Sequence, residues 1–110
     1  MPKGDFLGEF EIYVMLALTH LGPDAYGVTI RQEITGRTRR EIAIGAVYAT
    51  LSRLEAKGLV RHTLSDPLPI QGGRSRKHFT LTPAGERGLA HATRMLARMQ
   101  QGWHPSTQPS

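Results

Sequence analysis

Hydrophobic residues recur along the chain with two different periods, and the change of period predicts the order of helices and strands. Apolar side chains return every three or four positions, the spacing of a helix, in residues 8–21, 25–35, 44–57 and 82–103. Residues 59–64 and 78–81 alternate with a period of two, which is typical of antiparallel strands. The predicted order is three helices, a strand, a loop, a strand and a final helix.

Turn-forming and capping residues mark the ends of these elements. Gly22-Pro23-Asp24 ends the first helix, because proline cannot continue the hydrogen-bond ladder. We expect Gly36 to close the second helix and Gly58 to cap the third. Residues 41–43 are either part of a connector or a very short strand. Thr82-Pro83, a threonine N-cap followed by proline, begins the last helix.

The predicted order is that of a winged helix-turn-helix, a mainly α fold with a small β-hairpin (α+β). We assign residues 1–81 to the winged helix-turn-helix and residues 82–103 to a C-terminal dimerisation helix in the same compact domain. The polar, proline-rich residues 104–110 are predicted to be a disordered tail. The chain has no cysteine and no apolar run near the roughly 20 residues that cross a bilayer, which predicts a cytoplasmic protein.

The formal net charge of +5 is concentrated in the middle of the chain. Residues 31–77 hold ten Lys and Arg against four Asp and Glu, a net +6, whereas the remainder carries −1. A basic middle of this kind is expected for a protein that binds a polyanion. The alternative is a solvated basic surface without a partner, and charge alone does not separate the two.

The third helix offers a face for DNA. If its apolar positions Val47, Leu51 and Leu54 point inward, its outward face carries Ala46, Ala49, Thr50 and Arg53. Small side chains allow close approach to a groove, while Thr50 and Arg53 can bond base edges. Tyr48 lies at the flank, where its hydroxyl can reach a phosphate. The alternative is an amphipathic helix whose polar face meets only water.

Two further basic clusters lie on either side of this helix. The loop between the strands turns at Gly72-Gly73 and carries Arg74, Arg76 and Lys77, which predicts a wing that contacts the DNA backbone or the minor groove. Before the helix, the sequence places Tyr26, Arg37, Arg39 and Arg40 where they could hold phosphates. The alternative for one or two of these arginines is pairing with Glu33 or Glu41.

The last helix carries an apolar stripe at steps of three and four residues, formed by Leu89, Ala92, Leu96, Met99 and Trp103. The stripe packs either on the first helix of its own chain or in a two-fold dimer. We favour a dimer in which the first helix, with Phe10 and Val14, also takes part. Trp103 could cover an aromatic ligand at this interface, although a tryptophan on an apolar stripe more often serves packing.

Nothing in the sequence predicts an enzyme. The five histidines lack the spacing of metal ligands, and we expect no metal or cofactor. The chain has no nucleophile elbow, phosphate-binding loop or dinucleotide fingerprint. No residue is therefore assigned a catalytic role.

Four segments resemble the PadR family of regulators. They are Leu7-Gly8-Glu9-Phe10-Glu11, Ala25-Tyr26-Gly27-Val28, residues 44–60, and Leu81-Thr82-Pro83-Ala84-Gly85. The most specific part is Gly45-x-Val47-Tyr48-x-Thr50-Leu51-x-Arg53-Leu54-Glu55-x-Lys57-Gly58-Leu59. The resemblance covers about residues 6–103, which is nearly the whole chain.

The resemblance implies a homodimer that binds pseudo-palindromic operators in double-stranded DNA, usually as a repressor. It places the third helix in the major groove, the wing on the flanking backbone and the last helix in the dimer interface. Some members of the family release DNA when a small aromatic or lipophilic effector binds.

Two features depart from the family pattern. Ala43 stands where many relatives have a serine N-cap, which costs ~1 kcal/mol of local helix stability unless another group caps the helix. Only one helix follows the wing, as in the short subgroup, so effector binding does not carry over directly. Two other functions stay open: a winged-helix protein-interaction module that does not bind DNA, and a sensor of aromatic ligands around Trp103.

Overall fold

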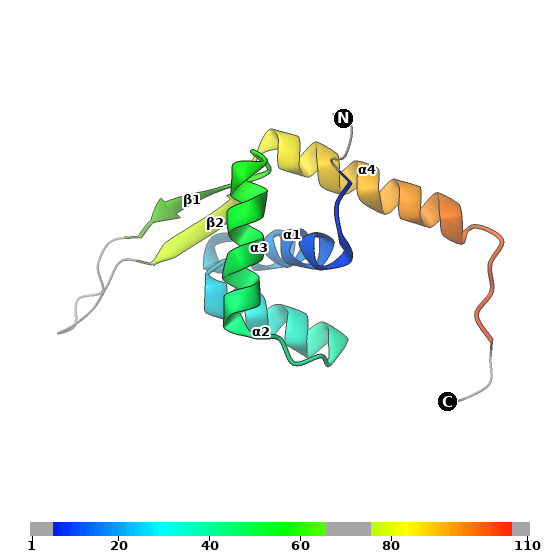
Figure 1. Cartoon of the computed structure of the whole chain (residues 1–110), viewed down its shortest axis with the longest axis horizontal. Helices are drawn as coiled ribbons and strands as arrows, with labels where there is room; N and C mark the ends of the chain where they lie inside the picture. Colours follow the sequence, from blue (N-terminus) through cyan, green and yellow to red (C-terminus); the bar gives the residue numbers. More distant parts are fainter. Residues whose placement is uncertain (1–5, 66–75, 107–110) are drawn as a thin grey trace.

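Four helices and a two-stranded sheet follow one another in the predicted order in the computed structural model, which describes residues 6–65 and 76–106 (Figure 1). The elements are α1 (Glu9–Leu21), the 3₁₀ turn η1 (Gly22–Asp24), α2 (Gly27–Thr38), α3 (Ile44–Ala56), β1 (Val60–Leu64), β2 (Lys77–Leu81) and α4 (Pro83–Gln100). The predicted α+β fold class is confirmed. Within the described residues, no helix combines the length and the apolar character that crossing a membrane requires.

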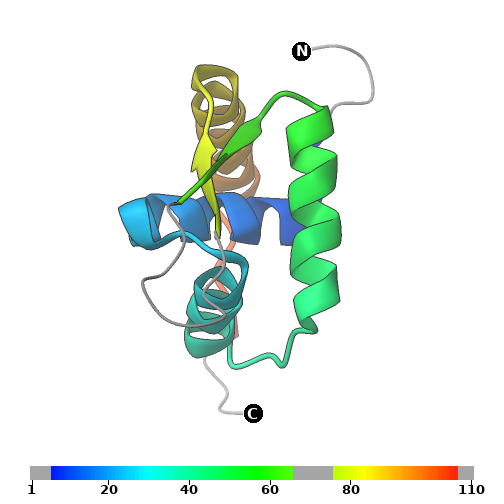
Figure 2. The ribbon, with the colours of Figure 1, turned by 90° about the vertical axis from the view of Figure 1, so that its left-hand side faces the viewer.

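Helix α1 is the centre of the molecule and packs against α2, α3, α4 and β2. Figure 2 shows it between α2 and α4, with α3 crossing at its side. Its apolar residues are spread over most of its circumference, which suits a helix with neighbours on several sides. The helix begins where the Gly8 N–H donates to Glu11 Oε1 at 2.9 Å and ends at Gly22, whose φ is 55°.

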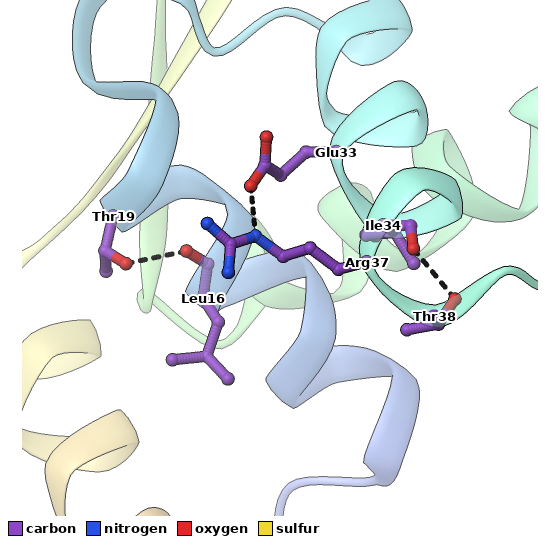
Figure 3. Close-up of polar contacts among 6 residues, drawn as sticks. All are labelled: Leu16, Thr19, Glu33, Ile34, Arg37 and Thr38. Atoms are coloured by element: carbon purple, nitrogen blue, oxygen red, sulfur yellow. Dashed lines mark hydrogen bonds and ion pairs between the residues drawn. The ribbon is translucent and has the colours of Figure 1, made fainter.

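Helix α2 continues past Gly36 to Thr38, so the prediction that Gly36 closes it is wrong. Figure 3 shows two contacts that stabilise its last turns. The Thr38 hydroxyl donates to the Ile34 carbonyl at 2.8 Å, and Arg37 forms an ion pair with Glu33. A glycine inside a helix costs only about 1 kcal/mol relative to alanine, so local contacts of this kind can offset it.

The connector between α2 and α3 is irregular, and the short strand considered for residues 41–43 does not form. Arg39 ends α2 in the left-handed conformation, with φ of 60°. Ile42 has a buried side chain. Its backbone carbonyl accepts a hydrogen bond from Arg31 Nε at 2.8 Å instead of pairing with a neighbouring strand. Ala43 is the N-cap of α3 without a side-chain hydrogen bond, as its sequence predicts.

The two strands form an antiparallel hairpin in which Val60 lies opposite Leu81 and Leu64 opposite Lys77. The Phe79 N–H of β2 also donates to the Ala25 carbonyl at 2.9 Å. This bond joins the sheet to the segment that leads into α2. The base of the wing is therefore held beside the start of α2.

Helix α4 is fastened at its first turn to the turn between α3 and β1. Thr82 Oγ1 accepts from the Gly85 N–H at 3.0 Å and donates to the Gly58 carbonyl at 2.7 Å. A Cβ on residue 85 would lie 1.9 Å from the Leu59 carbonyl oxygen, so this crossing requires glycine. Gly58 has φ of 75°, which fits its predicted role at the end of α3.

Candidate nucleic-acid interface

The N-terminus of α2 presents an environment suited to an anion. The first N–H groups of a helix have no acceptor within the helix, and the helix dipole is positive at this end. Tyr26 is the N-cap, and its own N–H donates to Thr29 Oγ1 at 2.9 Å. The N–H groups of Gly27 and Val28 belong to this first turn.

Tyr48 crosses from α3 to this helix end. A Cβ on residue 27 would lie 2.3 Å from the Tyr48 hydroxyl oxygen, so the phenol occupies space that only a glycine leaves open. Gly27 is buried beneath it, while the Tyr48 side chain remains 44% exposed. Gly27 was not among the predicted site residues, and its place directly after Tyr26 in the first turn of a helix was the signal that could have identified it.

The base of the wing also contacts Tyr26. The Arg76 guanidinium carbon lies 5.3 Å from the centre of the Tyr26 ring, in a cation–π contact. On β2, the His78 ring meets the Tyr26 ring edge-on, with 5.7 Å between ring centres. His78 Nε2 also lies 3.1 Å from the Gly22 carbonyl oxygen. These contacts orient the Tyr26 ring from the side of the wing.

These side chains surround an open pocket of about 510 Å³. Its lining consists of Tyr26, Gly27, Val28, Thr29, Gln32, Tyr48, Arg76 and Lys77. Four of the predicted DNA contacts, two tyrosines from α2 and α3 and two cations of the wing, thus meet in one place. Among the described residues, neither cation forms an ion pair. The pocket combines positive charge, hydroxyl donors and a helix N-terminus, the groups that bind phosphate.

The exposed face of α3 differs from the prediction at one position. Ala46, Ala49 and Arg53 are exposed as expected, but Thr50 is only 1% exposed and lies in the core. At 100° per residue, Thr50 is closer to the buried stripe than to the centre of the outward face. The outward assignment of Thr50 is therefore wrong, and Gly45 and Ser52, which the prediction omitted, are exposed instead.

The arginines near the connector are partly engaged within the chain. Arg37 pairs with Glu33, one of the two partners considered for it. Arg40 pairs with Glu9 of α1 at 3.2 Å, a partner that the sequence did not suggest. Arg39 is exposed, and the described residues hold no ion pair that involves it.

Glu11, on α1, holds the C-terminal end of α3. Its Oε2 accepts a hydrogen bond from Lys57 Nζ at 2.9 Å, and its Oε1 accepts from the Gly8 N–H. Burial raises the pKa of Glu11, but the hydrogen bonds from Gly8 and Lys57 and the charges of Lys57 and Arg53 outweigh it. The pKa therefore lies below its ordinary value of 4.5. This ionised carboxylate joins the central helix to the end of α3.

The apolar stripe of α4 is buried at its beginning and exposed at its end. Leu89 is 7% exposed, but the exposed fraction rises to 52% at Leu96 and 81% at Met99. The helix ends at Gln100, so the prediction that it reaches residue 103 is wrong, and Trp103, 62% exposed, lies just beyond it. Ala92 lies between these extremes. Figure 1 shows the second half of the helix extending beyond the other elements. The outer half of the stripe therefore has no cover in the single chain.

Two residues predicted for the dimer interface belong to the core of the single chain. Val14 is fully buried and Leu89 nearly so, which leaves them almost no surface for a partner. Their assignment to the interface is corrected, because α1 and the first half of α4 use these side chains to pack within the chain. Phe10 is half-buried on α1 and retains surface.

Some predicted features lie outside the described residues. They are Arg74, the Gly72-Gly73 turn of the wing and the last four residues of the tail. Residues 104–106 are exposed and lie outside any helix or strand. Within the ranges 6–65 and 76–106, no three His, Asp or Glu side chains are grouped to hold a metal ion.

Comparison with known proteins identifies the family of the chain. The family model described as the transcriptional regulator PadR-like family matches residues 15–91. A transcriptional regulator of Mycobacterium tuberculosis is 33% identical over 88 residues, which cover 78% of each chain. The structure of a PadR-like transcription factor from Bacteroides fragilis is similar with a TM-score of 0.71 and 27% identity, over 84% of each chain.

The fold itself recurs in a more distant protein. F93 from STIV, a winged-helix DNA-binding protein, has a TM-score of 0.66 and 18% identity, over 89% of this chain and 99% of its own. The model match covers well over half of the chain and includes α2, α3 and both strands. The chain belongs to the PadR-like family of transcriptional regulators, and its fold is a winged helix.

Proposed function

We propose that this regulator recognises a specific double-stranded DNA sequence with α3 and holds the flanking phosphates at the start of α2 and the base of the wing. The observation that carries the proposal is the shared pocket of Tyr26, Tyr48, Arg76 and Lys77. Charged and hydroxyl groups that converge on a helix N-terminus suit a phosphate better than they suit an apolar ligand. Arg74 belongs to the same proposal as a wing contact.

Base contacts are assigned to the exposed face of α3. Ala46 and Ala49 leave room for a groove edge and can meet a thymine methyl, while Arg53 can donate two hydrogen bonds to guanine. Gly45 and Ser52 lie on the same exposed face and join the proposed surface. Thr50 is not included, because its side chain does not reach the surface.

The proposal includes a homodimer that forms through α4. The exposed outer half of its stripe, with Leu96 and Met99, and the exposed Trp103 just beyond the end of the helix support a partner of the same kind, because identical apolar surfaces can cover each other across a two-fold axis. Phe10 extends this surface on α1. A two-fold dimer would present its α3 helices about 34 Å apart and would read a pseudo-palindromic operator.

We propose that the protein acts as a repressor in the cytoplasm, by occupying an operator that overlaps a promoter.

A second proposal is that a small aromatic or lipophilic effector binds the protein. The exposed indole of Trp103 beside the proposed interface favours it. Quenching of Trp103 fluorescence by planar aromatic compounds would support an effector site. A protein-interaction module is the competing function, and it predicts a folded dimer without affinity for DNA.

Fluorescence anisotropy tests the proposal. A labelled duplex from upstream of the protein's own gene is titrated over a salt series beside a scrambled duplex. We expect tighter binding to the upstream duplex. The logarithm of the association constant should fall linearly with the logarithm of the salt concentration. Absence of binding to either duplex at low salt would refute DNA binding, and equal binding to both would refute sequence recognition at this site.

Two variants separate the proposed contacts. Arg76→Ala should weaken binding to both duplexes and reduce the salt slope by about one, because it removes a phosphate contact. Arg53→Ala should reduce discrimination between the duplexes by about 1 to 3 kcal/mol, because it removes a base contact. Arg87→Ala, on the exposed surface of α4, is the control and should change neither quantity by more than about twofold.

A further inference from the structure

Thr50 is one of two buried polar or charged side chains in the described part of the chain, the other being Glu11. A buried hydroxyl must find a hydrogen-bond partner to offset the loss of water. Thr50 Oγ1 has one: it accepts from Arg53 Nη2 at 3.0 Å, one turn along α3. A core residue is thereby bonded to an exposed arginine on the face proposed to read DNA.

This bond orders the Arg53 side chain before DNA arrives. A guanidinium carries five N–H donors in a rigid plane, so one bond to Thr50 restricts the plane and leaves other donors free. Within the described residues, Arg53 has no other side-chain hydrogen bond and no ion pair. Thr50 is therefore its defined anchor.

Electrostatic attraction between Arg53 and Glu11 also restrains the Arg53 side chain. The Arg53 charge is among the causes that lower the pKa of Glu11, so the guanidinium and this carboxylate attract each other. Both Glu11 oxygens already accept hydrogen bonds, from Gly8 and from Lys57. Glu11 therefore draws the arginine toward the body of the protein, while Thr50 supplies the directional contact.

We propose that Thr50 is a positioning residue for DNA specificity: its buried hydroxyl holds the Arg53 guanidinium in the orientation that reads a base edge. This inference rests on the proposed function, in which Arg53 contacts a base. Thr50 itself does not touch DNA. Holding the arginine in advance reduces the side-chain freedom that is lost on binding and penalises orientations that suit the wrong base.

Three substitutions test the role of the hydroxyl. Thr50→Val keeps the shape of the side chain but removes its oxygen, Thr50→Ser keeps the oxygen, and Thr50→Ala serves if the valine variant fails to fold. The readout is the dissociation constant for the scrambled duplex divided by that for the upstream duplex, with thermal unfolding of each variant as the folding check. We expect Thr50→Val to reduce this ratio about fivefold to tenfold, and Thr50→Ser to stay within about twofold of the original protein.

A double-mutant cycle with Arg53→Ala separates positioning from a general effect on the core. In the Arg53→Ala background, Thr50→Val should no longer change the ratio. An equal loss in both backgrounds would overturn the proposal, as would an unchanged ratio in Thr50→Val when Arg53→Ala alone reduces it. If Arg53→Ala also leaves the ratio unchanged, the base contact proposed for Arg53 fails, and this result is distinct from failure of the Thr50 inference.

Discussion

Helices α3 and α4 both carry an apolar stripe, but the chain buries one almost completely and only the beginning of the other. The stripe of α3, with Val47, Leu51 and Leu54, is almost completely buried between α1, α2 and β1. The stripe of α4 begins in the core at Leu89 and is largely exposed at Met99. An apolar stripe in the sequence therefore predicts that the helix packs against another surface. The tertiary structure decides whether that surface belongs to the same chain or to another.

The difference follows from the position of the central helix. Helix α1 spans residues Glu9–Leu21, and α4, with 18 residues, is the longer of the two. Only the first turns of α4 therefore reach the core. The remaining turns extend beyond α1 with their apolar side chains uncovered (Figure 1). The inner part of α4 thus contributes to the fold, and its outer part is free for the proposed assembly.

The largest expected effect lies in the buried stripe. Leu51→Ala should lower the free energy of unfolding by about 2 to 5 kcal/mol, because it leaves a cavity between α1, α2 and α3. Urea denaturation measures it at a protein concentration below the dissociation constant of the proposed dimer, so that only the single chain is compared. The matched variant Leu96→Ala, on the exposed half of α4, should cost the single chain less than about 1 kcal/mol. Equal losses in the two variants would abolish the distinction between the stripes.

Met99→Glu should separate the proposed dimer without unfolding the chain. A carboxylate on the exposed stripe would be buried without a partner in the dimer, at a cost of about 3 kcal/mol or more. We expect sedimentation equilibrium to show a dissociation constant at least 100-fold higher, with unchanged circular dichroism. Ala97→Glu adds the same charge to the other face of α4 and should leave the dimer intact. A dimer that survives Met99→Glu would place the interface elsewhere.

Gly85→Ala should lower the free energy of unfolding by about 1 to 3 kcal/mol, because its Cβ would collide with the backbone of Leu59. Gly88→Ala is the matched control on the same helix. Its Cβ would meet Leu59 Cδ2 at 3.9 Å, an ordinary contact, so the better helix propensity of alanine should raise stability by up to about 1 kcal/mol. Thermal unfolding of both variants shows whether α4 needs a glycine at residue 85 to pass close to Leu59, while the glycine at residue 88 only lowers helix propensity.

The Glu11–Lys57 contact should affect how the free energy of unfolding changes with pH in the acid range. Because the pKa of Glu11 is lower in the folded chain, its stabilising contribution is present above pH 4.5 and is lost as the pH falls through the folded pKa. Glu11→Gln should cost about 1.5 kcal/mol at pH 7 and progressively less below pH 4.5.

Glu9→Gln is the control for this measurement. Glu9 lies in the same first turn but pairs with Arg40 on the surface, so we expect a change of less than about 0.5 kcal/mol at every pH. Urea denaturation between pH 3 and pH 7 compares the two variants. A difference between Glu11→Gln and the original protein that did not depend on pH would contradict a stabilising role for the ionised carboxylate.

Much of the fold was predictable because local signals agreed with the final packing. Thr82-Pro83 begins α4, Gly58 ends α3, and the alternating residues form the hairpin. The two errors had different causes: contacts within α2 offset the cost of a glycine, and a contact eleven residues apart in the sequence replaced the short strand. Gly36 did not end α2, and Ile42 satisfied its carbonyl with Arg31 instead of a strand.

The candidate site was also predicted only in part. The sequence identified Tyr26, Tyr48, Arg76 and Lys77 as separate phosphate contacts, and the tertiary structure brings all four to one pocket. The sequence analysis placed Thr50 on the outward face, because only Val47, Leu51 and Leu54 were assigned to the buried side of the helix. The neighbours of α3 decide otherwise, since α1 and α2 together cover a wider arc of that helix than its three apolar residues indicate.

By itself, the sequence determined the order of elements, the basic middle, the two apolar stripes and the membership in a family of DNA-binding regulators. These properties depend on spacing and composition, which a chain carries before it folds. Only the tertiary structure decided that Gly27 accommodates Tyr48, that Thr50 anchors Arg53, and that the outer half of α4 stays uncovered. The physical reason is that the space at Gly27, the burial of Thr50 and the exposure of α4 depend on how closely separate segments approach one another, and these distances are set when the helices pack around α1.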